Sequence, residues 1–189
     1  MYYIPMGYDC SPASALTGLG LRQRALPFDW VVLTIPALER CFQDNFQSYH
    51  TGLQYQVDPA KTTNGTYLID IYGVKFLHDY PMDGERIAFD WWSSYPKVYE
   101  KYRRRIRRFL DIVHDKANPL VILCRYSPED TVKLKELFKT YFGREDVKIV
   151  SASWGAVDDP DIVIINAEAE GNWNETKFWK EGLDKVLAK

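Results

Sequence analysis

The chain has 189 residues, a length that suits one domain and can bury a core without disulfides or metals. Hydrophobic residues make up 46% of it and charged residues 26%, so the composition is that of a globular protein. The net charge of −2 gives no global electrostatic reason to expect nucleic acid, and no apolar run approaches the ~18 residues of a membrane span. We therefore expect a single domain over residues 1–189, with neither nucleic acid nor membrane as partner.

The three cysteines, Cys10, Cys41 and Cys124, are odd in number and widely spaced. This spacing indicates neither a disulfide framework nor a zinc site, so we expect reduced thiols, no metal and no cofactor. Because no signal-like segment opens the sequence, a cytoplasmic location is the expectation.

A strand, a tight turn and a helix are predicted over residues 2–19. The apolar strand at 2–6 leads into Gly7, and Ser11–Pro12 have the character of a helix N-terminus. Cys10 stands between them, where the N–H groups of a helix favour thiolate and therefore nucleophilicity. A structural role is the alternative, because free cysteine commonly behaves as a small buried hydrophobe.

The stretch Pro27–Phe28–Asp29–Trp30 follows that helix. Asp29 is an acid between two large rings and needs a partner if it is buried. It could orient a catalytic histidine or pair with an arginine. The whole stretch could equally form a packed corner and nothing more.

The middle of the chain is predicted to alternate between helix, loop and short strands. Apolar spacing predicts a helix at 35–46 that buries Cys41, and residues 50–66 are polar and irregular. A hairpin or two short strands follow at 67–71 and 74–77, the second ending in His78–Asp79. Residues 82–94 are predicted to form a loop, in which Trp91–Trp92 either line a substrate or cover the core.

A long amphipathic helix is predicted from residue 96 to residue 116, with basic side chains crowded on its polar positions. Arg104, Arg105 and Arg108 belong to this run. Such a run commonly forms a solvated face. The alternative is an anion site, because arginine presents a planar fork to phosphate, sulfate or carboxylate.

The last third of the chain predicts a layered sheet. Apolar strands are expected at 120–124, 147–151 and 161–166, with helices at 129–142 and 174–187. Continuous apolar strands alternating with helices favour a single three-layer α/β domain, a mostly parallel sheet with helices on both faces. Asp159–Pro160–Asp161 is interpreted as a turn rather than a metal-binding pair.

Ligands of open α/β sheets bind beyond the carboxyl ends of the strands. Cys10, His78 and Arg125 each follow a predicted strand, so the three side chains would meet on one edge if those strands run parallel. His78 would then be the base for Cys10, with Asp79 or Asp29 orienting its ring. His50, in the polar loop, and His114, near a helix end, are weaker candidates.

Several separated motifs occur in a fixed order along residues 2–126: Gly7-x-x-Cys10-x-x-Ala13-x-x-Leu16, Leu21–Arg22, Pro27–Phe28–Asp29–Trp30, Phe76-x-His78–Asp79, Tyr102-x-Arg104–Arg105–Ile106-x-Arg108–Phe109 and a strand ending in Arg125. Together they resemble a family of bacterial and viral proteins labelled putative papain-like cysteine peptidases, a domain of unknown function. The resemblance implies a nucleophile at Cys10 and a histidine at His78. A papain-like α+β fold is therefore the alternative architecture.

Two features depart from the papain pattern. Asp9 precedes Cys10, where the papain signature has glutamine ahead of the cysteine and Cys-Gly-Ser-Cys-Trp around it. The strand pattern also predicts a layered parallel sheet, whereas papain-like folds pair a cysteine-bearing helix with an antiparallel sheet that carries the histidine. Both departures leave the reaction open.

Three functions follow as hypotheses. The first is a cysteine-dependent hydrolase or acyl transferase with a Cys10–His78 dyad. The second is a sugar transferase, whose arginines hold a phosphorylated or nucleotide-sugar donor. The third is a non-catalytic carbohydrate- or protein-binding module. The substrate would be a small molecule, a peptide or a glycan, with an anionic one favoured by the arginines. The candidates for substrate contact are Arg104, Arg105, Arg108, Arg125, Trp30, Trp91 and Trp92.

Overall fold

The structure is a computed structural model that describes residues 1–58, 65–166 and 175–188. In chain order its elements are β1 (Tyr2–Gly7), α1 (Ser11–Gly18), β2 (Val31–Val32), α2 (Ile35–Gln43), β3 (Gln54–Val57), β4 (Thr66–Ile69), β5 (Lys75–Phe76), β6 (Met82–Asp83), β7 (Arg86–Ile87), the 3₁₀ turn η1 (Trp91–Ser94), α3 (Tyr95–His114), β8 (Leu120–Arg125), α4 (Pro128–Phe142), β9 (Val147–Ala152), β10 (Ile162–Ile165) and α5 (Thr176–Leu187).

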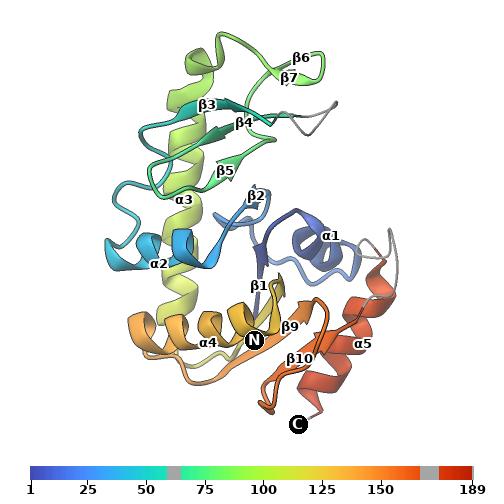
Figure 1. Ribbon diagram of the computed structural model, residues 1–189. Coiled ribbons are helices and arrows are strands. Elements are labelled where there is room, and N and C mark those ends of the chain that lie inside the picture. Colours follow the sequence, from blue (N-terminus) through green and yellow to red (C-terminus); the bar gives the residue numbers. More distant parts are fainter. Residues whose placement is uncertain (59–64, 167–174, 189) are drawn as a thin grey trace.

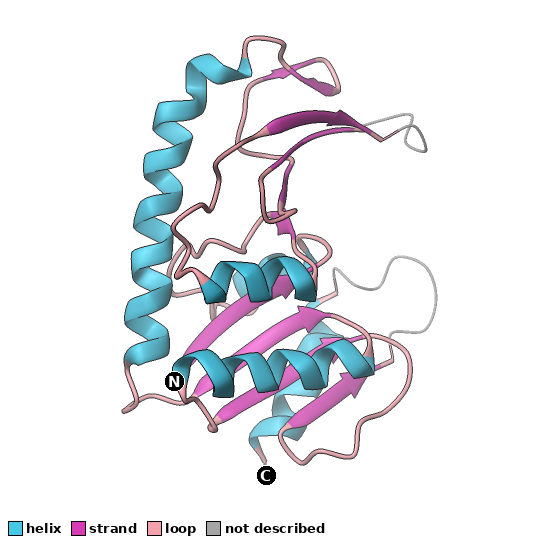
Figure 2. Cartoon of the chain, turned by 60° about the vertical axis from the view of Figure 1, so that its left-hand side comes forward, coloured by secondary structure: helices cyan, strands magenta, loops and turns pink. Residues whose placement is uncertain are grey.

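A parallel sheet in the order β1-β8-β9-β10 forms the lower part of the molecule (Figure 1). Alternate side chains of β8 enter different cores: Val121 and Leu123 pack with α1 and α5, whereas Ile122 and Cys124 face the larger core. Helices therefore cover both faces of the sheet, as Figure 2 shows. This arrangement confirms the predicted α/β layers, because a strand buried on both faces must be apolar throughout.

A second, antiparallel sheet in the order β2-β5-β4-β3 lies above the parallel one in Figure 1, with the β6–β7 hairpin beyond it. The prediction of an irregular 50–66 stretch was wrong for β3, whose side chains are mostly exposed and carry no apolar alternation. The 82–94 segment is also more ordered than the predicted loop, since it contains β6, β7 and η1. The fold thus adds an antiparallel extension to the parallel α/β layers.

Helix α3 joins the two parts. It runs for 20 residues alongside both sheets (Figure 1). Its buried residues Tyr102 and Phe109 belong to one core cluster with Phe76 of the antiparallel sheet and Ile122 of the parallel sheet. At the junction Leu33 N donates to Gly7 O at 2.9 Å. One core cluster therefore extends from the antiparallel sheet into the parallel sheet, and a second, smaller cluster lies between the parallel sheet and helices α1 and α5.

Several predicted helices have different bounds in the structure, and the one expected at 96–116 spans Tyr95–His114. The helix expected at 35–46 ends at Gln43, because Asn45 and Phe46 adopt positive φ angles of 54° and 61° that a right-handed helix excludes. The start expected at residue 174 lies outside the described residues, and α5 is described from Thr176. In the described segments, no helix combines the length and apolar character that crossing a membrane requires.

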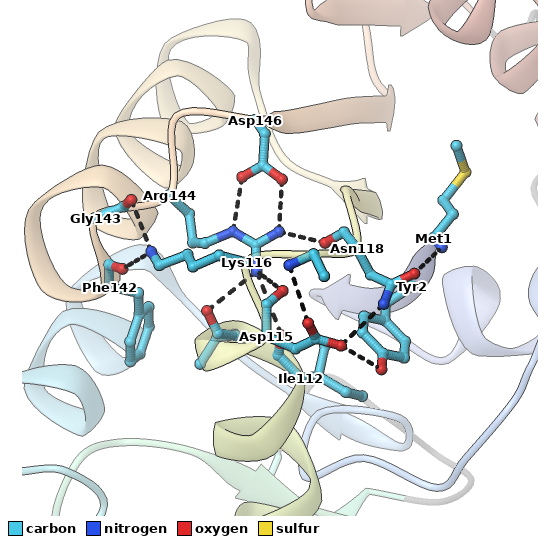
Figure 3. Close-up of polar contacts among 12 residues, drawn as sticks. Met1, Tyr2, Ile112, Asp115, Lys116, Asn118, Phe142, Gly143, Arg144 and Asp146 are labelled. Atoms are coloured by element: carbon cyan, nitrogen blue, oxygen red, sulfur yellow. Dashed lines mark hydrogen bonds and ion pairs between the residues drawn. The ribbon is translucent and has the colours of Figure 1, made fainter.

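The C-terminal end of α3 is held by Arg144, whose side chain is fully buried. The guanidinium donates to the main-chain oxygens of Val113 at 3.2 Å and Asp115 at 2.8 Å (Figure 3). It also donates to Asn118 O at 2.6 Å and to both carboxylate oxygens of Asp146. A cation at this position satisfies carbonyls that a helix end leaves unpaired and complements the helix dipole.

Replacing Arg144 by Met should lower the free energy of unfolding by about 3 kcal/mol, because the α3 carbonyls and Asp146 would lose their buried donor. Urea unfolding followed by circular dichroism measures the change. The matched control is Lys139→Met, which removes an exposed pair with Glu145 and should change the stability by less than about 1 kcal/mol. Equal effects of the two substitutions would contradict the assigned role of Arg144.

Candidate active site at the carboxyl edge of the parallel sheet

The carboxyl ends of β1, β8 and β9 surround a cavity of about 240 Å³. Gly7 is paired with Arg125 and Cys124 with Ser151, so the residues after these strands come together although they are far apart in the sequence. This edge is where parallel α/β sheets bind their ligands. The lining residues are Tyr8, Asp9, Arg125, Tyr126, Ser127, Ala152, Ser153 and Trp154.

Gly7 makes the turn from β1 toward this cavity possible. Its φ angle is +142°, and a Cβ at this position would lie 2.9 Å from the backbone nitrogen of Arg125. A side chain here would therefore push β1 away from β8 as well as strain the backbone. Glycine lets the chain pass close to β8 and present Tyr8 and Asp9 at the cavity.

Cys10 is the N-cap residue of α1 and is half-buried. The expected cap at Ser11 is shifted by one residue, and the capping acceptor is Asp9, which receives the Ser11 N–H at 2.9 Å and its hydroxyl at 2.6 Å. The other oxygen of Asp9 pairs with Arg125. Cys10 thus stands at the positive end of a helix and directly follows Asp9 in the chain, although it is not itself among the residues that line the cavity.

The other two cysteines lie in the core, as predicted for Cys41, and burial is the main cause that raises the pKa of both. The pKa of Cys124 rises to about 12. Formation of the thiolate is therefore suppressed at Cys41 and Cys124.

His78 lies at a different place from the one expected. The strand before it, β5, belongs to the antiparallel sheet, so the premise that it runs parallel to β1 and β8 was wrong. His78 is exposed and lines a cavity of about 160 Å³ with Thr66, Leu77 and Met82. Within the described ranges no hydrogen bond joins His78 to Cys10, and the dyad stays a prediction.

The two acids proposed to orient His78 have other partners. Asp79 pairs with Lys101 and accepts the hydroxyl of Tyr102. Asp29 is buried, pairs with Arg22 and accepts the Leu26 N–H at 3.2 Å. Burial raises the pKa of Asp29, and the bond from Arg22 offsets part of that rise. Asp29 thus anchors the Pro27–Trp30 corner.

The four candidate arginines do not converge on one ligand. Arg125 alone among them lines the edge cavity, whereas Arg104 is exposed at another cavity beside Asp79. Arg105 lies 5.4 Å from the ring of Tyr102, and Arg108 reaches the main-chain oxygen of Ala25 at 3.5 Å. The sugar-transferase hypothesis therefore has no shared arginine site in the part of the chain that is described.

The aromatic candidates are also divided between places. Trp30 lies under the guanidinium of Arg22 at 5.7 Å, and Trp91 and Trp92 line a cavity of the antiparallel part. Trp154, which the sequence analysis did not select, is 63% exposed and lines the edge cavity. The signal for Trp154 was available, because it follows β9 just as Arg125 closes β8.

The carboxylates at 159–161 form a structural turn. Lys135 Nζ lies 2.8 Å from Asp159 and 2.9 Å from Asp161, so these acids tie the turn before β10 to α4. Over residues 1–58, 65–166 and 175–188, no group of three or more His, Cys, Asp or Glu side chains is placed to hold a metal ion.

The environment of His50 differs from the predicted one. It was expected in a polar loop, yet it is fully buried, with its ring nearly parallel to those of Tyr95 and Tyr80 at centroid distances of 5.8 Å. Its Nε2 lies 2.7 Å from the hydroxyl of Tyr80, while its Nδ1 has no hydrogen-bond partner among the described groups. Burial lowers the pKa of His50 to about 4.

The fold and the cavity define an α/β protein with an accessible cysteine at the carboxyl edge of its parallel sheet. Residues 1–148 match the family described as "Putative papain-like cysteine peptidase (DUF1796)", and the chain belongs to this family. That description names a class of hydrolases and no substrate.

The chain also matches a viral protein. An uncharacterized protein of Acanthamoeba polyphaga mimivirus is 25% identical over 142 residues, which cover 67% of this chain. The match spans 62% of the viral protein, less than two thirds of its length. No solved structure matches the chain.

Iodoacetamide near neutral pH should label Cys10 in the folded protein and leave Cys41 and Cys124 unmodified, because only Cys10 is accessible. Mass spectrometry of the digested protein locates the label, and all three cysteines should react in denaturant. Modification of Cys41 or Cys124 ahead of Cys10 would show that the described burial is wrong.

The stability contributed by neutral His50 should be lost as the pH falls. Its folded pKa of about 4 lies below the ordinary 6.5, so the unfolded chain binds more protons between these values and the loss approaches about 3 kcal/mol. The negative charge of Asp79 raises the pKa of His50 and offsets part of the shift, whereas the positive charge of Lys101 lowers that pKa further. Asp70, whose pKa burial raises to about 6, acts with the opposite sign, since its contribution is lost as the pH rises from about 4 to 6.

Comparison with His50→Asn isolates the histidine, because asparagine tolerates the φ of +61° at this position. Denaturant unfolding at pH 7 and pH 4.5 should show the stability gap between the two proteins narrowing by about 2–3 kcal/mol at the lower pH. A gap that is independent of pH would contradict a buried neutral His50.

Proposed function

We propose that the chain is a cysteine-dependent hydrolase or acyl transferase with Cys10 as its nucleophile. The observation that carries this proposal is the position of the thiol. It is half-buried at the first turn of α1, directly after a parallel strand and next to the cavity that Asp9 and Arg125 line. Membership of a family named for cysteine peptidases supports the same chemistry.

In the proposed reaction the Cys10 sulfur attacks a carbonyl carbon, and the carbonyl electron pair moves onto the oxygen. N–H groups at the start of α1 stabilise this oxyanion. Collapse of the intermediate expels the leaving group, which takes up the proton that the thiol released, and an acyl thioester remains. Water then attacks the thioester in a hydrolase, and a second nucleophile does so in a transferase.

His78 is proposed to carry the proton between the thiol and the leaving group. Its support is the Phe76-x-His78–Asp79 motif and its exposed position, which leaves the ring accessible. Catalytic hydrogen bonds commonly tighten only when substrate is bound, so the bond to Cys10 would form in the complex. Asp79, held by Lys101 and Tyr102, fixes the main chain next to His78.

The cavity next to Cys10 favours an acyl substrate with an anionic group and an apolar or aromatic group. Arg125 offers a charged fork, although Asp9 already pairs with it. The exposed rings of Tyr8 and Trp154 supply apolar surface on the same cavity. A peptide with an acidic side chain and small acidic esters or thioesters have these features.

Cys10→Ser should lower the turnover of a responsive substrate by roughly 10³-fold or more. Serine is a preferred N-cap residue, so the helix should remain intact while the nucleophile is lost. Fluorogenic peptides and small acidic thioesters provide the assay, and intact-mass measurement should detect an acyl adduct on the wild-type protein that the variant lacks. Full activity of Cys10→Ser would overturn the proposal.

His78→Ala should lower the same rate by roughly 10²–10⁴-fold and change its pH profile, because general-base help is lost. His114→Ala is the matched control, since His114 is another exposed histidine, on α3. Loss of activity in Cys10→Ser without loss in His78→Ala would retain the thiol nucleophile and remove His78 from the mechanism.

A further inference from the structure

A second cavity, of about 400 Å³, lies in the antiparallel part of the molecule and shares no lining residue with the cavity next to Cys10. Its walls carry the rings of Tyr55, Phe89, Trp91 and Trp92. Phe89 is 86% and Trp92 is 52% exposed. Large rings gathered in this way at a hollow surface mark a binding site rather than a core.

Contacts within the protein hold these rings in place. Trp91 packs edge-on against buried Tyr80 with 5.6 Å between ring centroids, and Trp92 packs edge-on against Phe89 at 5.3 Å. The hydroxyl of Tyr55 donates to the main-chain oxygen of Ile87 at 3.4 Å, which ties β3 to the β6–β7 hairpin. The aromatic surface is therefore formed before any ligand arrives, which lowers the entropy cost of binding.

Two charged side chains of the hairpin line the same cavity. Asp83 and Arg86 are opposite each other in the β6–β7 register. Neither forms an ion pair with another residue of the described segments. A carboxylate and a guanidinium beside exposed rings offer hydrogen-bond acceptors and donors to a ligand with many hydroxyl groups.

A basic cavity of about 370 Å³ adjoins the aromatic one, because the same two segments bound both. Asp83 and Trp92 line the aromatic cavity. Pro81 and Ser94, each two residues away in the chain, line the basic one. Lys97, Lys101 and Arg104 line the basic cavity and share one face of α3, at positions i, i+4 and i+7. Lys101 is paired with Asp79, whereas Lys97 and Arg104 have no ion-pair partner in the described part of the chain.

We propose that the two cavities together bind an acidic saccharide. The C–H face of a sugar ring packs on Trp92, and its hydroxyl groups bond with Asp83 and Arg86. The acidic substituent reaches Lys97 and Arg104. This site is separate from Cys10 and does not depend on the hydrolase proposal.

Other occupants match the surface less well. A purely apolar peptide would cover Asp83 and Arg86 without giving them partners, which is costly. A ligand with hydroxyl groups and one acidic group per ring satisfies the rings, the hairpin charges and the lysine–arginine face.

Titration with trisaccharides of galacturonic and of glucuronic acid, followed by calorimetry and tryptophan fluorescence, tests this proposal. We expect binding that weakens in high salt, and at least tenfold weaker binding of the matched neutral trisaccharides. Trp92→Ala should weaken binding of the acidic trisaccharides by tenfold or more. Lys97→Ala combined with Arg104→Ala should reduce their affinity to that of the neutral ones and remove the salt dependence.

Two matched controls assign any binding to this site. Trp154→Ala removes an exposed tryptophan from the other cavity, and Lys133→Ala removes an exposed lysine from α4. Both should bind like the wild type. The proposal is overturned if none of the acidic trisaccharides binds, if Trp154→Ala weakens binding while Trp92→Ala does not, or if triglutamate binds as well as they do.

Discussion

Helix α3 determines how the two sheets are placed, and its C-terminal end is the constraint on which this placement depends. The last carbonyls of a helix have no partner within it, and those of Ile112 and Val113 at the end of α3 face the protein. Arg144 meets this need with a fully buried guanidinium that serves the carbonyls of α3 and the carboxylate of Asp146. The same cation links the end of α3 to the segment that leads into β9, so the helix and the parallel sheet keep one geometry.

At the carboxyl edge of the parallel sheet, a charged side chain again links two segments of the chain. Asp9 caps α1 with one oxygen and binds Arg125 with the other, which joins the turn after β1 to the end of β8. Gly7 allows the strands to approach closely enough for this pair to form. The position of Cys10 is thus set by its neighbours on both sides, and its role as nucleophile stays a prediction.

The buried, continuous strands could be predicted from the sequence because their apolar runs are dictated by burial on both faces. Both the run at 120–124 and the layered sheet it implied appear in the structure. Strand β3 could not be found in this way, since its side chains are mostly exposed and its pairing with β4 is made by the backbone.

The candidate site was predictable in part. The strand–glycine–cysteine–helix order identified Cys10, because each of these residue types has a local conformational reason to be there. Partners from distant segments had no such local signal. The environment of His50 depends on rings at positions 80 and 95, and the sheet to which β5 belongs decides where His78 lies. Arg144 has a charged side chain whose buried role follows only from where a distant helix ends.

The length of α3 limits how the molecule can move. A 20-residue helix packed along both sheets resists closure of the antiparallel part over the parallel part as a rigid body, because one core cluster includes residues of both sheets and of the helix. If His78 reaches Cys10 during turnover, we expect the rearrangement to come from the short segment after β5 rather than from α3. Catalysis in this protein would then be gated by a loop rather than by domain closure, and the proposed saccharide site, beside the first half of α3, could be occupied without disturbing it.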